Sequence, residues 1–247
     1  MLSSLRYLRT RNDIDTGRIG LLGHSEGGMI APMVAAREEG IAFVVLWGAP
    51  AAGGEKINIA QNALQLKKMN LGDTAIRAFR ELHGSVLEQF KKAGSKKELD
   101  SLIGPIFGKW RSEQDSNTLR QLQVKGDALL GVNIYQFYAP LYNSPWLRFF
   151  IRYDPMTDLT RVRCPILAIN GSKDTQVEAP DNIPLIAEAA KRSHNPDCTT
   201  LVLPGLNHLL QRADTGDLTE YLTLDETISP AALQTIGDWM VKRAVTR

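Results

Sequence analysis

The stretch from Gly20 to Ala31 constrains the fold of this chain more than any other. A short apolar run leads through the pattern Gly23-x-Ser25-x-Gly27 into a segment with helical character. A serine between two such glycines is typical of a nucleophile elbow, a sharp turn from a strand into a helix. We expect glycine at both positions because a Cβ atom there would clash with neighbouring backbone. The bare pattern also arises by chance in glycine-containing chains, so the flanking strand and helix are what favour the elbow.

Composition narrows the class of protein and of partner. With 247 residues, 43% of them hydrophobic and 23% charged, the chain suits one large globular domain or a domain with an insertion. A net charge of +2 argues against a nucleic-acid partner or a polybasic membrane surface. No apolar run reaches the length of a membrane span, and arginines interrupt the first residues, so neither a membrane anchor nor a signal peptide is expected.

The cysteines and histidines do not form a metal-binding pattern. Two cysteines and four histidines lack ligand-like spacing, so no metal ion is expected. Cys164 and Cys198 each stand near the start of a predicted strand. We expect two ordinary buried thiols; a disulfide in an oxidising compartment is the alternative.

The elbow belongs to a strand–helix–strand unit. Residues 19–22 and 41–46 are predicted strands on either side of the helix that contains Pro32. Such a unit implies parallel strands with helices on both faces of the sheet, an α/β fold. Further elements are expected later in the chain: strands at 165–170 and 199–203, and helices at 2–11, at 183–191 and from Pro230 onward, the last with an apolar stripe of Leu233, Ile236 and Met240.

The middle of the chain has a different character. Between about residues 55 and 152 no convincing strand is predicted, and the apolar spacing is helical, as in the face formed by Ile76, Phe79, Leu82, Val86 and Phe90. Eight aromatic residues crowd into positions 135–153. For any one of these rings a place in a helical core is favoured over a place in an apolar substrate pocket, although the two roles are compatible.

A serine nucleophile needs a base, and the histidines can be sorted by position. His24 adjoins Ser25, where its side chain should diverge from the hydroxyl; His83 lies in the helical region. His194 precedes the last predicted strand, whereas His208 follows it. Because chemistry in open α/β sheets takes place outside the carboxyl ends of the strands, His208 is predicted to be the base.

The acid is selected by its position in the same way. Asp174 follows the third predicted strand at its carboxyl end. The chain order Ser25, Asp174, His208 is the order of serine, acid and histidine in triads on this type of sheet. Alternatives further from a strand end are Asp158 and Asp181.

With these residues in place, the chain resembles the bacterial carboxylesterases of the α/β-hydrolase superfamily that carry a helical cap. The resemblance implies ester hydrolysis with Ser25 as nucleophile, Asp174 as acid and His208 as base, on a small-molecule ester and without a cofactor. It further implies the backbone N–H of Glu26 as an oxyanion donor. The segments that carry the resemblance are IGLLGHSEGGMIAP (19–32), SPWLRFFIRYDP (144–155), CPILAINGSKDTQV (164–177), LPGLNHLLQ (203–211) and the stretch 226–239.

The resemblance also implies a domain organisation. It predicts the C-terminal part of an α/β-hydrolase core sheet, with the elbow in residues 1–53 and the acid and base in 154–247, interrupted by a helical cap over 54–153. The family carries about four strands and a His-Gly oxyanion loop ahead of the helix with which this chain begins, so the chain is expected to be N-terminally incomplete. The elbow strand would then be an edge strand, and self-association through it is expected.

Two rival functions share this framework. One is a peptidase or acyl-peptide hydrolase with the same triad and fold. The other is a catalytically silent α/β-hydrolase-like binding protein, favoured by the missing second oxyanion donor. A cytoplasmic location is the default expectation, and export is the alternative should a signal precede Met1.

Overall fold

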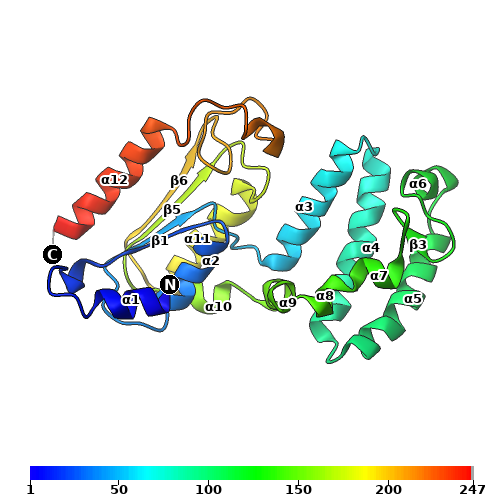
Figure 1. Cartoon of the computed structure of the whole chain (residues 1–247), viewed down its shortest axis with the longest axis horizontal. Helices are drawn as coiled ribbons and strands as arrows, with labels where there is room; N and C mark the ends of the chain where they lie inside the picture. The colour runs from blue at the N-terminus through cyan, green and yellow to red at the C-terminus, as the bar shows by residue number, and fades with distance from the viewer. Residues whose placement is uncertain (246–247) are drawn as a thin grey trace. The chain divides into compact units, whose positions relative to one another are not determined.

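The structure, a computed structural model, describes residues 1–245 and divides the chain into two compact units (Figure 1). The larger unit consists of residues 1–52 together with those from 154 onward, and the smaller unit of residues 53–153. The sequence places the corresponding boundaries after residues 53 and 153.

A parallel sheet of four strands forms the centre of the larger unit, and all four follow the strands predicted from sequence. The strands pair in the order β1-β2-β5-β6. Their bounds are Leu21–His24 (β1), Val44–Trp47 (β2), Ile166–Gly171 (β5) and Cys198–Leu203 (β6). The two central strands, β2 and β5, are almost entirely buried because both sides of the sheet are covered there.

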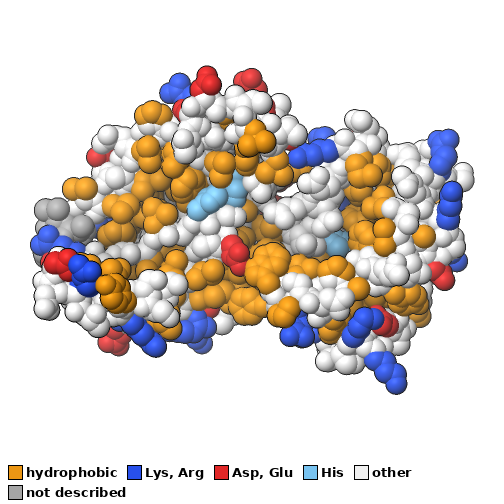
Figure 2. Space-filling view, in the orientation of Figure 1, with side chains coloured by type: hydrophobic (Ala, Val, Ile, Leu, Met, Phe, Trp, Pro, Cys, Tyr) orange, Lys and Arg blue, Asp and Glu red, His pale blue; other side chains and the backbone are white. Residues whose placement is uncertain are grey.

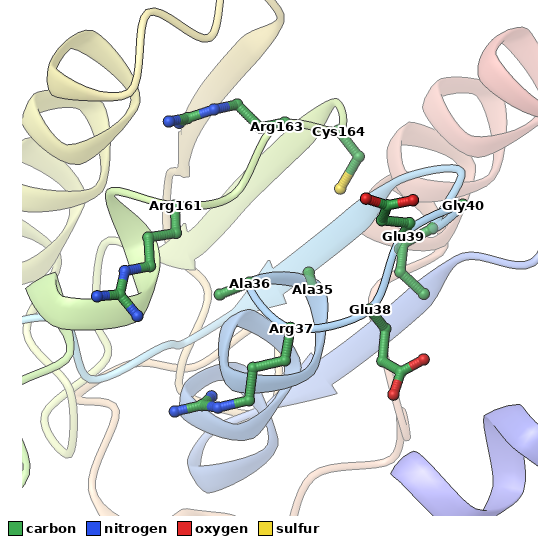
Figure 3. A pocket seen from close by; sticks show the side chains of 10 residues that line it. Ala35, Ala36, Arg37, Glu38, Glu39, Gly40, Arg161, Arg163 and Cys164 are labelled. Atoms are coloured by element: carbon green, nitrogen blue, oxygen red, sulfur yellow. The ribbon is translucent and has the colours of Figure 1, made fainter.

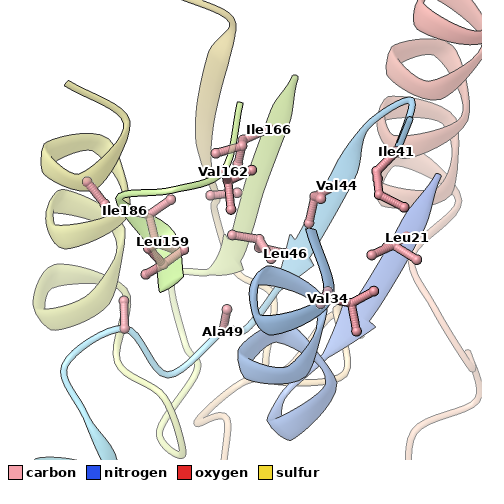
Figure 4. Packing of buried hydrophobic residues seen from close by; sticks show 14 of the residues in the cluster. Leu21, Val34, Ile41, Val44, Leu46, Ala49, Leu159, Val162, Ile166 and Ile186 are labelled. Carbon is pink, nitrogen blue, oxygen red and sulfur yellow. The ribbon is translucent and has the colours of Figure 1, made fainter. Parts of the chain in front are cut away.

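Helices lie on both faces of this sheet (Figure 1). Successive side chains of a strand point to opposite faces of the sheet, so each face has its own apolar cluster. Val44 and Leu46 belong to one cluster, and Val45 belongs to the other. The first cluster includes residues of α1, α2, α10 and α11, and the second includes residues of α12 (Figure 4). Burying one such side chain stabilises the fold by about 1.5–3 kcal/mol. The bounds are Leu2–Leu8 (α1), Glu26–Ala35 (α2), Met156–Leu159 (α10), Ala179–Arg192 (α11) and Pro230–Val245 (α12), with short 3-10 turns at Thr16–Arg18 and Leu218–Glu220.

Strand β1 ends the sheet. Among residues 1–245 its only strand partner is β2. Leu21 on one side of β1 is buried, whereas Leu22 on the other side is 43% exposed. The elbow strand is therefore an edge strand in the described part of the chain, and its pairing with a second chain stays a prediction.

The C-terminal helix α12 shows one error in the predicted apolar stripe. Ile236 is buried and Met240 packs against the core, but Leu233 is 53% exposed. The buried stripe instead runs through Ala232, Ile236 and Trp239. Both sets have helical spacing, so periodicity alone does not distinguish them; contact with the sheet does.

The smaller unit is helical, with one small hairpin that the sequence did not predict. Strands β3 (Ala128–Leu129) and β4 (Val132–Asn133) pair antiparallel. Leu130 and Gly131 between them both have positive φ, which is the geometry of a tight hairpin turn. The strands were missed because two residues cannot show a periodicity. The helices are Gly54–Lys68 (α3), Asp73–Lys92 (α4), Lys96–Ser112 (α5), Ser116–Gln121 (α6), Ile134–Tyr138 (α7), Pro140–Asn143 (α8) and Pro145–Arg152 (α9).

The aromatic residues of this unit divide between core and surface. On the predicted apolar face of α4, the buried residues are Phe79, Leu82, Val86 and Phe90. Of the eight rings between positions 135 and 153, Tyr138 and Phe150 are buried, whereas Trp146 and Phe149 are 52% exposed. The preference for core therefore holds for only some of these rings.

The two cysteines and the hydropathy of the helices were the subject of two further predictions. Cys164 and Cys198 are free thiols and form no disulfide with each other; both are partly exposed, so the prediction of buried thiols is wrong in that respect. Cys198 is the first residue of β6, and Cys164 lies two residues before β5. Among the described helices, none combines the length and the hydropathy needed to cross a membrane.

Candidate active site

Ser25 occupies a strained position at the junction of β1 and α2. Its φ of 52° and ψ of −118° lie outside the regions that residues with a side chain favour. Such a conformation costs about 1–3 kcal/mol and persists only where the surroundings enforce it. The predicted elbow is thus present as a sharp turn that holds the serine between a strand and a helix.

The glycines of the elbow have different roles. A Cβ atom on Gly23 would lie 2.0 Å from the carbonyl oxygen of Gly27, and one on Gly28 would lie 2.6 Å from the Cβ atom of Ala49. A Cβ atom on Gly27 itself would meet nothing within 4 Å. The expectation of a clash two residues after Ser25 is therefore wrong: the close approaches fall at Gly23 and Gly28.

Backbone hydrogen bonds hold the turn in place. The N–H of Ser25 donates to the carbonyl of Trp47 on β2 at 2.8 Å, and the N–H of Gly28 donates to the carbonyl of Ser25, also at 2.8 Å. Glu26 is the first residue of α2. N–H groups in the first turn of a helix point outward along its axis, and the helix dipole favours negative charge there. The end of α2 beside Ser25 is accordingly suited to an anion.

Asp174 and His208 form a buried pair. His208 Nδ1 lies 2.7 Å from Asp174 Oδ2, and both residues are 4% exposed. Asp174 Oδ1 accepts the backbone N–H groups of Gln176 and Val177 at 3.0 and 2.9 Å, and the Asn170 side-chain amide donates to Oδ2 at 3.3 Å. The carboxylate thus has hydrogen-bond donors on both oxygens, as a buried charge requires.

This pairing sets the protonation of the imidazole. Because a carboxylate accepts hydrogen bonds, Nδ1 of His208 carries the proton, and Nε2 of the neutral ring keeps a lone pair that can accept one. Within residues 1–245 no hydrogen bond joins the Ser25 hydroxyl to His208. Such contacts are often long before substrate binds. The structure brings the acid and the base into direct contact. The elbow serine follows β1, two places in the sheet from the strand before the acid and three from the strand before the base.

A glycine at the end of β2 makes room for this pair. Gly48 has a φ of 55°, and a Cβ atom there would lie 3.0 Å from the His208 ring and 3.3 Å from Asp174 Oδ2. Gly48 was not among the site residues predicted from the sequence. Its position directly after a predicted strand, at the carboxyl edge of the sheet, was the available signal.

Two aromatic side chains hold the main chain of His208, and neither was predicted. The carbonyl oxygen of His208 accepts the indole N–H of Trp47 at 3.0 Å and lies 3.1 Å from Nε2 of His24. The His24 ring lies 4.6 Å from the His208 ring and 4.5 Å from the Trp47 ring, between centroids. The contacts span more than 160 residues of sequence, which local patterns do not reveal. In Figure 2 histidine side chains appear at the surface of the larger unit among apolar ones.

The other candidates from the sequence lie elsewhere. His83 is buried in the smaller unit, and His194 is exposed just after α11, before β6. Asp158 is fully buried and forms an ion pair with Arg37 at 3.1 Å, and Asp181 lies in the first turn of α11. In the described part of the chain no group of histidine, cysteine and acidic side chains is arranged to hold a metal ion.

One surface pocket of the larger unit is at the opposite end of the sheet from the acid and base. Its volume is about 550 Å³, and it lies beside the end of α2 and the loops that lead into β2 and β5 (Figure 3). Arginine and glutamate side chains line it, and Glu38 is paired with Arg9 at 2.9 Å. Since chemistry on such sheets takes place at the carboxyl ends of the strands, this pocket is not the candidate active site.

Comparison with known proteins adds a partial family match. Residues 3–105, which include the elbow, match the family described as the C-terminal domain of BAAT/acyl-CoA thioester hydrolases. This is less than half of the chain. A comparison with curated protein sequences finds no significant match.

Several solved structures are similar at low sequence identity. The esterase Pf2001 of Pyrococcus furiosus has 13% identity and a TM-score of 0.47, with 97% of this chain and 58% of that chain covered. The proline iminopeptidase of Mycobacterium smegmatis has 16% identity and a TM-score of 0.42, with coverages of 91% and 65%. An α/β-fold family hydrolase from Bacillus anthracis has 15% identity and a TM-score of 0.44, with coverages of 98% and 72%. At these TM-scores the similarities carry no argument about site or substrate.

The parallel sheet with helices on both faces, the strained serine at a strand–helix turn, and the family match over residues 3–105 define the class. The chain has the α/β-hydrolase type of fold, and its elbow-bearing part is similar to the C-terminal domain of BAAT/acyl-CoA thioester hydrolases. It spans 58% of the length of the Pyrococcus esterase.

Proposed function

We propose that this chain carries the catalytic residues of a serine hydrolase that cleaves carboxylic esters through an acyl-enzyme. The observation that supports this most is the buried hydrogen bond of 2.7 Å between His208 and Asp174, at the sheet edge where the elbow presents Ser25. A buried carboxylate that orients a histidine beside a serine is the arrangement that activates a hydroxyl.

The proposed reaction proceeds in two stages. His208 Nε2 removes the Ser25 proton as the hydroxyl oxygen attacks the ester carbonyl, and Asp174 stabilises the imidazolium that forms. The backbone N–H of Glu26 donates to the oxyanion of the tetrahedral intermediate. His208 then gives its proton to the departing alcohol. Water, activated by the same histidine, releases the acid from the acyl-enzyme.

The family match supports a second candidate within the same chemistry. Its description names acyl-CoA thioester hydrolases, and the matched residues include Ser25 and Glu26. A thioester reacts through the same acyl-enzyme and has a leaving group that needs less help from His208 as an acid, because a thiol is a stronger acid than an alcohol. An acyl-CoA thioester is therefore the alternative substrate class; an aminoacyl amide, the substrate of a peptidase, is a third.

Hydrolysis of a short-chain aryl ester, an acyl-CoA and an aminoacyl amide, measured in parallel, tests the proposal. We expect ester hydrolysis that falls by roughly 10⁶-fold, or to the assay background, in Ser25→Ala. A preference for acyl-CoA would move the substrate class to thioesters. No hydrolysis of any of the three by a folded chain would support the silent binding protein instead.

A further inference from the structure

The main-chain carbonyl of His208 is held by two side chains from the strands that build the elbow. Trp47, the last residue of β2, donates its indole N–H to this oxygen at 3.0 Å. His24, the last residue of β1, places Nε2 at 3.1 Å from the same oxygen. A carbonyl oxygen only accepts hydrogen bonds, so Nε2 of His24 carries a proton and donates it.

The remainder of the base loop is tied to other parts of the sheet. The N–H of Lys173, after β5, donates to the carbonyl of Leu206 at 2.9 Å. Asn207 braces the turn from within, since its Oδ1 accepts the N–H groups of Leu209 and Gln211 at 2.9 and 3.0 Å. These bonds place the loop against β5, but they do not relate it to the strand that carries the serine. The contacts of Trp47 and His24 provide that relation to β2 and β1.

His24 is next to Ser25 in the chain, so one peptide unit separates the proposed nucleophile from a group that holds the proposed base. Burial lowers the pKa of His24, and the nearby His208 imidazole lowers it further. A neutral His24 donates its hydrogen bond without placing a positive charge against His208, whose ring must accept a proton in the transition state.

We propose that His24 is a positioning residue: together with Trp47 it holds the His208 main chain, and thereby sets the imidazole in register with the Ser25 hydroxyl. The inference rests on the proposed function for its catalytic meaning. It assigns His24 no contact with substrate and no proton transfer.

Two substitutions separate positioning from packing. His24→Gln keeps an N–H donor at a similar reach, whereas His24→Phe keeps the ring against Trp47 and removes the donor. We expect His24→Phe to lower kcat for ester hydrolysis by roughly 10- to 100-fold with little change in KM, because a small displacement of a catalytic group has an effect of that size. His24→Gln should recover most of the loss. The matched control is His194→Asn, an exposed histidine with positive φ beyond α11, which should behave as the unaltered chain does.

A second measurement does not depend on turnover. The proton on His208 Nδ1, hydrogen-bonded to Asp174, should give a downfield NMR resonance that identifies the pair. We expect this resonance to shift or broaden in His24→Phe and to stay in place in His24→Gln and His194→Asn.

The outcomes distinguish the two proposals. If the unaltered chain hydrolyses ester and His24→Phe matches it in kcat and in the resonance, the positioning role is wrong. If Phe and Gln lower kcat equally, with equal losses of melting temperature, His24 is only a packing residue and the proposal is again wrong. If the unaltered chain cleaves nothing, the proposed function fails, and the resonance alone decides whether His24 positions His208.

Discussion

His83 in the smaller unit and His208 in the larger unit are equally buried, at 4% exposure each, but their partners differ. His208 donates from Nδ1 to a carboxylate at 2.7 Å. His83 donates from Nε2 to the side-chain oxygen of Asn58 at 2.7 Å, and its Nδ1 lies 3.2 Å from the hydroxyl of Tyr138. One histidine has a negatively charged partner and the other has only neutral ones.

The difference shows what burial alone does to an imidazole. Burial lowers the pKa of His83 to about 4, so this ring stays neutral at physiological pH. Its neutral form satisfies both nitrogens: Nε2–H donates, and Nδ1 accepts from Tyr138. His208, by contrast, has a buried anion beside it that stabilises the positive ring a base must form. A histidine deep in a core is therefore a candidate base only where a carboxylate faces it.

The largest expected effect comes from making the partner of His208 neutral. In Asp174→Asn the side-chain oxygen can still accept the two backbone N–H groups, which turns the amide NH₂ toward His208 and favours the wrong tautomer of the ring. We expect kcat for ester hydrolysis to fall by about 10⁴-fold, equivalent to about 5.5 kcal/mol, while the fold is retained.

Asp197→Asn is the matched control for this substitution. Asp197 precedes β6, at the other end of the sheet, where its ion pair with Arg243 lies away from the acid and base. Its removal should leave kcat unchanged. Steady-state kinetics with circular dichroism checks both variants, and an Asp174→Asn rate within tenfold of the original would contradict a catalytic role for the pair.

The next effect concerns stability and follows from the neutral surroundings of His83. The pKa of His83 is about 4 in the folded chain, and in the unfolded chain it has the ordinary value of 6.5. Between these two pH values the unfolded chain binds a proton that the folded chain does not. The contribution of the neutral His83 to the stability of the folded chain is complete above pH 6.5 and is lost as the pH falls toward 4. We expect the loss of this contribution to lower the free energy of unfolding by about 3 kcal/mol between about pH 7 and pH 4.

Urea unfolding of the chain and of His83→Gln across this range measures the contribution. Carboxylates also titrate here, so the difference between the two proteins is the relevant quantity. Glutamine keeps a donor toward Asn58 and cannot be protonated, so its curve should be flatter by the stated amount. Parallel curves would show that His83 does not titrate as its burial predicts.

The smallest expected effect makes His83 resemble His208. Asn58→Asp places a carboxylate 2.7 Å from Nε2 of His83. An adjacent opposite charge should raise the pKa of His83 by about 1–3 units. NMR titration of the ring protons follows the change, and Asn62→Asp, one turn further along α3 and bonded to Asn58, is the control, with a smaller shift expected. An unchanged pKa in Asn58→Asp would contradict the central role given to the charged partner.

Much of the fold could be predicted because its signals are local. Four runs of branched apolar residues became the four parallel strands, and the glycine pattern around Ser25 became the strained turn between β1 and α2. The contact between Asp174 and His208 also followed from sequence, because both residues come directly after strands whose carboxyl ends share one edge.

The remainder depends on contacts between distant segments. The hydrogen bonds of His24 and Trp47 to the His208 carbonyl join positions 184 and 161 residues apart. The error at Leu233 has the same origin, because two helical stripes had equally good spacing and only the sheet selects one. The expectation of a clash at Gly27 was wrong for a related reason: the close approach is made by the backbone carbonyl of Gly27, and it requires glycine at position 23.

Labelling by a fluorophosphonate, located by mass spectrometry, tests the central claim most directly. The probe phosphonylates a serine only where a base activates it, and it needs no knowledge of the substrate. We predict a single adduct at Ser25 that forms on the unaltered chain and is lost, or slowed by several orders of magnitude, in His208→Phe. A folded chain in which Ser25 stays unlabelled, or labels equally fast without His208, would contradict the account.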